Sequence, residues 1–109
     1  MFRARFQKLA KLGRRHIPTA PRPDIRWADV VRIEALGTDA LGVFEVSVFF
    51  SHRDGREARL CVEQKGYDEI LESLPRRFPS IPPTWYEEMA EQPWHVERVL
   101  YSRDENPVS

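Results

Sequence analysis

The stretch VFEVSVFFSHRDGREARLCVE, residues 43–63, decides the fold, because it predicts a β-hairpin whose register can be derived. Apolar residues recur at every second position on both sides of Asp54-Gly55, a dipeptide typical of tight turns. They are Phe44, Val46, Val48 and Phe50 before the turn, and Ala58, Leu60 and Val62 after it. A period of two is typical of strands with one buried face.

The length of the turn fixes which residues face each other. A two-residue loop at Asp54-Gly55 would place the two apolar sets on opposite faces of the hairpin, which a one-sided core forbids. A three-residue loop, residues 53–55, with Gly55 at positive φ brings both sets to one face. The pairs it predicts are Phe50 with Ala58, Val48 with Leu60, and Val46 with Val62.

The same register predicts a mixed outer face. Phe49 lies opposite Arg59, Ser47 opposite Cys61, and Glu45 opposite Glu63. Two carboxylates directly opposite each other repel, and Arg32 on a preceding strand is expected to lie beside them. Phe49 is expected to need a cover.

The rest of the chain predicts a small α+β domain. Val31, Ile33 and Ala35 alternate with charged residues in a strand at about 29–36, and a loop follows at residues 37–42. Apolar spacing indicates a helix at 67–74 that Pro75 ends. A capping box, Thr84 to Glu87, starts a second helix that runs to about residue 91, and a last strand is expected at 96–101. The predicted sheet is an antiparallel meander of three to four strands.

The first 16 residues predict an amphipathic helix that is rich in bases. Phe2, Phe6 and Leu9 share one helical face. The bases are Arg3, Arg5, Lys8, Lys11, Arg14 and Arg15, and no acid lies among them. Three prolines make residues 17–23 an extended linker. The single domain then spans 24–103, and residues 104–109 are expected to form a loose tail.

The charge of the chain is zero in total but unevenly distributed. Of 17 bases and 17 acids, seven bases and no acid lie in residues 1–22, which leaves ten bases and 17 acids in residues 23–109. This basic arm has three candidate partners: an anionic membrane surface, nucleic acid, or protein. Protein is favoured, either the acidic body of the same chain or a second copy, and nucleic acid is disfavoured because no base-reading residues accompany the bases.

Three aromatic residues near the C-terminus have two interpretations. Trp85, Tyr86 and Trp94 lie among prolines and glutamates. They are candidate anchors for a partner protein, as Phe49 is, because Trp and Tyr are favoured at interfaces. The alternative is that at least two of them complete the core.

No pattern of residues predicts catalysis, a metal or a cofactor. His16, His52 and His95 lie far apart in sequence, outside the spacing that pairs metal ligands on one element. Cys61 is the only cysteine, and its place in a strand pattern predicts that it is a packing residue. A chain without an internal disulfide is expected in a reducing, cytoplasmic compartment. A small enzyme that uses Glu45 and Glu63 as an acid/base pair is a secondary alternative.

Two resemblances follow from these motifs. The segment Ile25-Arg-Trp27-Ala-Asp29-Val30, the Asp54-Gly55 hairpin and the following helix are similar, over residues 25–75, to the C-terminal half of bacterial PH-like domains. The segment GYDEILESLPRRFPSIPPTWY resembles a group of small bacterial proteins that have no assigned activity. These resemblances imply a bacterial source and an α+β fold, with strands followed by a covering helix.

The sequence therefore predicts a non-catalytic protein-binding module of the bacterial cytoplasm. An antidote (immunity-like) protein is one form of this module, because an acidic and aromatic surface suits a basic toxin. The alternative is a peripheral membrane protein anchored by the basic helix.

Overall fold

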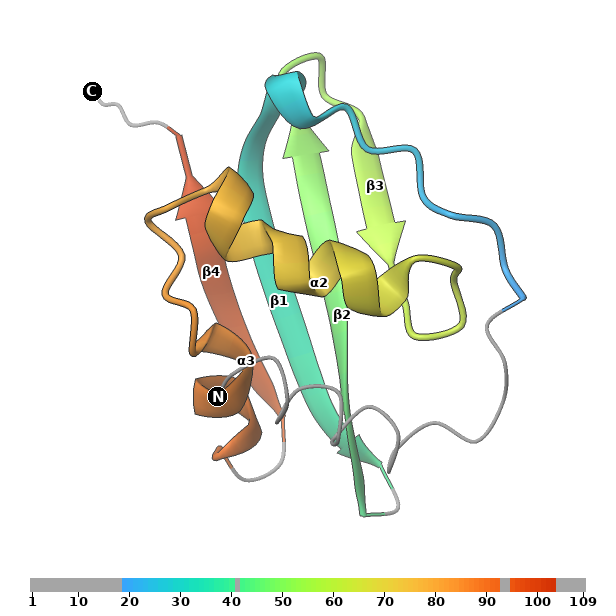
Figure 1. The fold of residues 1–109 in the computed structure, drawn as a ribbon, viewed down its shortest axis with the longest axis vertical. Coiled ribbons are helices and arrows are strands. Elements are labelled where there is room, and N and C mark those ends of the chain that lie inside the picture. The colour runs from blue at the N-terminus through green and yellow to red at the C-terminus, as the bar shows by residue number, and fades with distance from the viewer. Residues whose placement is uncertain (1–18, 41, 93–94, 104–109) are drawn as a thin grey trace.

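Four antiparallel strands form a single sheet in the computed structural model, which describes residues 19–40, 42–92 and 95–103. The strands are β1 (Val30–Ala40), β2 (Val43–His52), β3 (Glu57–Leu60) and β4 (Val96–Ser102), in the order β3-β2-β1-β4. A single 3-10 turn, η1 (Trp27–Asp29), precedes β1. Helices α2 (Tyr67–Arg77) and α3 (Trp85–Ala90) lie on one side of the sheet (Figure 1). The α+β class and the antiparallel sheet are confirmed. The predicted helical arm and the loose tail lie outside the described residues.

The register of the β2–β3 hairpin confirms the three-residue loop. Phe50 pairs with Ala58 and Val48 with Leu60. The His52 N–H donates to the Arg56 carbonyl at 2.8 Å and closes the loop. Gly55 has a φ of 92°, in the region that suits glycine.

The hairpin is shorter than the sequence predicts. The ladder ends at Leu60, so the expected pairs Val46–Val62, Ser47–Cys61 and Glu45–Glu63 are not part of it. After Leu60 the chain forms a local turn, residues 61–64, in place of further strand. The Cys61 N–H donates to the Gln64 side chain at 2.6 Å, and the Gln64 N–H donates to the Cys61 carbonyl at 3.0 Å. These bonds replace the ones that a longer β3 would have made.

Replacing Gly55 with alanine tests the loop. We expect Gly55→Ala to lower the free energy of unfolding by about 1 kcal/mol, because a Cβ at positive φ crowds the backbone. Urea denaturation followed by circular dichroism measures the change. Arg53→Ala, an exposed change in the same loop, is the control and should stay within about 0.5 kcal/mol. Equal stability of Gly55→Ala and the parent chain would contradict this loop geometry.

A β-bulge at the start of β1 corrects the predicted buried set. Val30 pairs with His52, and Arg32 pairs with Ser51, so Val31 is an extra residue in β1. The extra residue shifts the alternation by one position. Val30 is therefore buried in place of Val31, which is half-buried.

The predicted loop at residues 37–42 is mostly strand. Ala40 pairs with Val43, which leaves only two residues between β1 and β2. Gly37 lies inside β1, on the buried face. A Cβ at Gly37 would lie 2.6 Å from the tip of the Phe44 ring and 3.0 Å from a methyl carbon of Val96. This glycine therefore makes room for a packed aromatic ring and does not form a turn.

Both helices differ from their predicted ends. Helix α2 continues past Pro75 to Arg77, and the Phe78 N–H still donates to the Leu74 carbonyl at 2.8 Å. A proline in the last turn removes only its own backbone donor, so the helix survives it. Helix α3 begins after Thr84, as predicted, but the capping box does not form: the Thr84 hydroxyl donates to the Glu88 carboxylate at 2.6 Å.

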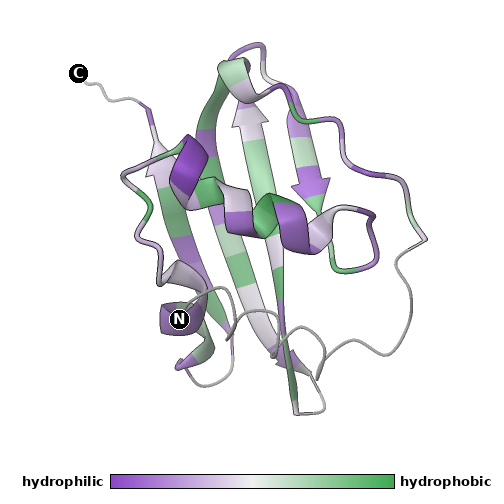
Figure 2. Ribbon diagram, in the orientation of Figure 1, coloured by the Kyte–Doolittle hydropathy of each residue, from purple (hydrophilic) through white to green (hydrophobic). Residues whose placement is uncertain are grey.

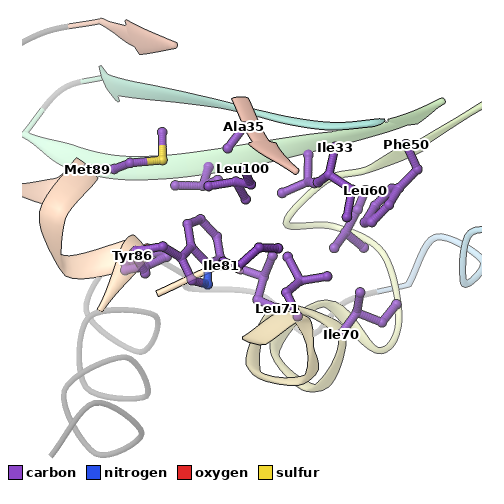
Figure 3. Close-up of a cluster of buried hydrophobic side chains, with 14 of the residues drawn as sticks. Ile33, Ala35, Phe50, Leu60, Ile70, Leu71, Ile81, Tyr86, Met89 and Leu100 are labelled. Carbon is purple, nitrogen blue, oxygen red and sulfur yellow. The ribbon is translucent and has the colours of Figure 1, made fainter. Parts of the chain in front are cut away.

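The core lies between the sheet and the two helices (Figures 2 and 3). Ile33, Phe50 and Leu60 of the sheet are fully buried, and so are Leu71 of α2 and Ile81 of the connection between the helices. Figure 3 shows these side chains converging from both layers, with Leu100 of β4 in the middle of the cluster and Met89 of α3 at the end opposite Phe50. The predicted final strand is thus confirmed as β4, and it contributes to the core.

A buried histidine, His52, links the segment before β1 to the β2–β3 loop by hydrogen bonds. His52 is 3% exposed. Its Nε2 accepts a hydrogen bond from the Arg26 N–H at 3.1 Å, which leaves Nδ1 to donate to the Arg56 carbonyl at 3.1 Å. These two bonds join the residues before β1 to the β2–β3 loop. The sequence assigned His52 no role, because it lies far from the other histidines; in the structure its two hydrogen bonds give it a structural one.

Candidate protein-binding surface

The face of the sheet opposite the helices is the candidate site, and we call it the outer face. Both described helices lie on the other side (Figure 1). Its central row runs across all four strands: Val99 of β4 pairs with Glu34 of β1, Glu34 with Phe49 of β2, and Phe49 with Arg59 of β3. Alternation within each strand puts these side chains on the outer face, because their neighbours Ala35, Val48 and Leu60 are buried.

Three apolar side chains form a patch on this face. Leu36, Phe49 and Val99, which we call the outer patch, line a concavity of about 500 Å³. Val99 is 46% exposed and is the one large apolar residue of the described chain that is classed as exposed. Leu36 and Phe49 are half-buried. Exposed apolar groups that gather in a hollow with polar residues around it are typical of interaction sites.

Phe49 was predicted to need a cover, and the structure gives it a partial one. The Arg59 guanidinium lies 5.8 Å from the centre of the Phe49 ring. A cation over an aromatic ring at an exposed position contributes about 0.5–1 kcal/mol. The Phe49 side chain is half-buried in this arrangement.

Carboxylates dominate the rim of the outer face. Glu34, Glu57 and Glu97 line the larger concavity together with Arg98. A smaller concavity of about 140 Å³ is lined by Glu45, Glu63, Arg59 and Cys61, among others. The two hollows together bring five glutamates to this face, and two arginines, Arg59 and Arg32, accompany them there, with Arg32 paired to Glu34. The face therefore favours a cationic partner.

The arginine that was predicted to relieve Glu45 and Glu63 does not do so. Arg32 donates to Glu34 at 2.8 Å, in a pair whose side chains are 44% and 46% exposed. In the ladder, Arg32 pairs with Ser51, whereas Glu45 pairs with Thr38, six residues further along β1. The prediction failed because the sequence alone does not fix the offset between β1 and β2.

Glu45 and Glu63 share the rim of the smaller concavity, although they are not ladder partners. Neither histidine of the described chain lines that concavity: His52 bonds to Arg26 and Arg56, and His95 lies 3.0 Å from Glu97. Among the described residues, no three His, Cys, Asp or Glu side chains gather as a metal site. No helix in that part of the chain is long and apolar enough to cross a membrane.

Two of the aromatic candidates belong to the core. Trp85 is 0% and Tyr86 2% exposed, and their rings pack edge to face, with centres 5.6 Å apart. Tyr86 also packs edge to face against Phe44, at 5.9 Å. Their burial corrects the prediction that they are partner anchors and supports the alternative that they complete the core. A helix of six residues can bury both because it lies directly against the sheet.

The remaining predicted contact residues lie outside the described residues. They are Phe2, Arg3, Arg5, Phe6, Lys8, Leu9, Lys11, Arg14, Arg15 and Trp94. Phe49 is the one candidate that the structure places on an accessible surface. Sequence reasoning missed its neighbours Leu36 and Val99, because they belong to strands far apart in the sequence and only the pairing of β4 with β1 brings them together.

Three pKa shifts describe the electrostatics around the sheet. The Thr84 hydroxyl and then Arg98 hold the pKa of Glu88 below its ordinary value, and Arg98 donates to Glu88 at 2.7 Å. The Arg56 backbone N–H lowers the pKa of Asp54. On the helix side, burial raises the pKa of Tyr67 well above its ordinary value, and its hydroxyl donates to the Val46 carbonyl. Tyr67 therefore stays neutral and ties α2 to β2.

The ion pair of Arg98 with Glu88 orients the side chain of Arg98 toward α3, since Arg98 pairs with the inward-facing Ala35 in the ladder. This leaves the glutamates as the main charged groups of the outer face. Comparison of the chain with protein-family models, curated proteins and solved structures found no match.

Proposed function

We propose that this chain is a non-catalytic protein-binding module of a bacterial cytoplasm, and that the outer face is its interface. The observation that carries the proposal is the outer patch: Leu36, Phe49 and Val99 line one concavity that no described helix covers. Apolar contact in the centre with polar groups around it is the usual anatomy of a protein interface.

The charge of the outer face specifies the kind of partner. Glu34, Glu57 and Glu97 surround the outer patch, so a partner that brings Lys or Arg to this rim gains favourable pairs, and an acidic partner is repelled. An antidote that neutralises a basic toxin is the form of this function that the rim suits. An anionic membrane surface is disfavoured at this face for the same electrostatic reason.

A photo-crosslinking phenylalanine analogue in place of Val99 tests the proposal in bacterial cells. We expect one discrete crosslinked protein of basic composition, because Val99 is the most accessible member of the outer patch. The same analogue at Arg76, an exposed position of α2, is the matched control and should give none. Phe49→Asp should reduce the crosslink at least fivefold, since it places a charge in the centre of the interface.

The outcomes separate the candidate functions. Purified partner should bind the full chain in calorimetry and lose affinity at least tenfold with Phe49→Asp. Equal crosslinking from positions 76 and 99, or an acidic partner, would contradict the proposal. Co-sedimentation of the full chain with vesicles of anionic lipid, without any protein crosslink from position 99, would establish the membrane function in its place.

A further inference from the structure

A carboxylate lies in the middle of the outer patch. Glu34 of β1 pairs with Phe49 of β2 on one side and with Val99 of β4 on the other. Leu36 is the next residue of β1 on the outer face, because Ala35 between them is buried. Side chains directly opposite each other on antiparallel strands have Cβ atoms about 5 Å apart. Glu34 therefore has an apolar side chain beside it on three sides.

The Glu34 carboxylate has room for a second cationic group. Its Oε2 accepts a hydrogen bond from the Arg32 guanidinium at 2.8 Å. The two side chains are 46% and 44% exposed, so the pair is accessible from outside. A carboxylate has two oxygens and accepts several hydrogen bonds. Glu34 can thus bind a donor from a partner while it keeps its bond to Arg32.

The larger concavity combines apolar and anionic groups. The outer patch contributes three apolar side chains to its lining, and Glu34, Glu57 and Glu97 contribute carboxylates. An apolar side chain in this space would take carboxylates out of water without a partner, which costs free energy. A long basic side chain suits both kinds of surface, because it has an apolar stem and a charged head.

The Phe49 ring favours arginine over lysine as this side chain. A guanidinium already lies near the ring, since that of Arg59 is 5.8 Å from its centre. Arg59 lines the smaller concavity and does not line the larger one, whereas Phe49 does. A planar guanidinium stacks on a ring and donates two parallel N–H groups to a carboxylate, whereas the ammonium group of lysine is a compact point charge.

We propose that Glu34 and the outer patch form a binding site for one arginine side chain of the basic partner. The guanidinium lies against the Phe49 ring and donates to Glu34, and the apolar stem lies over Leu36 and Val99. The other glutamates of the rim add a negative potential that favours the cation. The inference rests on the proposed function, since it names the group by which the partner enters the outer face.

Titration of the isotopically labelled full chain with short peptides, followed by nuclear magnetic resonance, tests the site. Acetyl-Gly-Arg-Gly-amide should shift the backbone amide signals of Glu34, Phe49 and Val99 saturably and leave those of α2 unchanged. The same peptide with citrulline, which has the shape of arginine without its charge, should bind at least fivefold more weakly, and the lysine peptide at least twofold. Affinity for either that equals the affinity for the arginine peptide, or shifts confined to α2, would overturn the inference.

A matched pair of variants separates the site from the overall charge. Glu34→Gln keeps the size of the side chain and removes its charge, so it should weaken the arginine peptide at least fivefold. Glu91→Gln makes the same change at an exposed residue that follows α3 and should stay within twofold of the parent chain. Equal effects of the two variants would show that only net charge matters, which contradicts the site.

Arg59→Ala has an expected effect of the opposite sign. Arg59 is exposed, and its guanidinium is a like charge beside the ring that the peptide contacts. Its removal should tighten binding of the arginine peptide at least twofold, because the repulsion is lost. A gain in affinity cannot come from partial unfolding, so this variant separates binding from stability. Unchanged or weaker binding would contradict a guanidinium against Phe49.

These results are distinguishable from the failure of the proposed function. If position 99 crosslinks to a basic protein but the arginine peptide does not bind, the inference fails and the protein interface stands. If the peptide binds at Glu34 but position 99 crosslinks to no basic protein, the guanidinium site stands and the proposed interface fails. Where both hold, Glu34→Gln should weaken the purified partner at least tenfold, and an unchanged affinity would overturn the inference.

Discussion

Trp85→Ala is expected to lower the free energy of unfolding by about 3–5 kcal/mol, the range for removing a large aromatic ring from a core. Trp85 is 0% exposed and heads the buried side chains in size. It lies in a six-residue helix that holds its place by packing, because so short a helix is not stable alone. Urea denaturation followed by far-ultraviolet circular dichroism measures the loss.

Trp85→Phe is the matched control for this prediction. It keeps most of the buried ring and removes the indole N–H, which is buried and has no hydrogen-bond partner among the described residues. The cost should therefore stay below about 1.5 kcal/mol. A loss below 1 kcal/mol for Trp85→Ala, together with loss of partner binding, would restore Trp85 as an interface anchor.

Gly37→Val is expected to cost about 1–3 kcal/mol, the usual penalty for overpacking a filled core. Even a Cβ at this position would lie 2.6 Å and 2.9 Å from two ring carbons of Phe44. The ring cannot turn away freely, because it packs edge to face on Tyr86 at 5.9 Å. By propensity alone the change should be favourable, since valine suits a strand better than glycine does. A destabilising Gly37→Val change would therefore support tight packing of Phe44 against Gly37, and a stabilising change would contradict it.

A double-mutant cycle isolates the contact. Phe44→Leu removes the ring that occupies the space above Gly37, so Gly37→Val should cost at least 1 kcal/mol less in that background than in the parent chain. Equal costs in both backgrounds would show that the penalty does not arise from Phe44. Urea denaturation of the four chains measures each free energy.

The hairpin could be predicted because the decisive information is local. Apolar alternation on both sides of Asp54-Gly55 allows one register with a common buried face, and the observed pairs Phe50–Ala58 and Val48–Leu60 follow it. The same register also predicts that Phe49 lies on the outer face, opposite Arg59, as it does in the structure. The register prediction failed beyond Leu60, because the Cys61 N–H donates to the Gln64 side chain and not to a strand partner. A pattern of alternating apolar residues does not predict such a side-chain hydrogen bond.

The elements that were predicted wrongly depend on contacts between distant residues. The bulge at Val31 and the strand assignment of Gly37 follow from how β1 meets β2 and β4. Gly37 looked like a loop residue because glycine usually weakens strands, yet it is required there by an aromatic ring that arrives from β2. For Tyr86 the sequence left an interface role and a core role open, because aromatics serve both surfaces and cores, and only the position of α3 against the sheet distinguishes the two.

The amino-acid sequence by itself determined the class of the fold, the register at the turn end of one hairpin and the concentration of bases in residues 1–22. Each depends on the period, spacing or charge of residues close together in the chain. Only the tertiary structure decided that Leu36, Phe49 and Val99 share one hollow among glutamates. Those three side chains come from three strands, and the order and offset of strands depend on how the whole core packs, which is a property of no single segment.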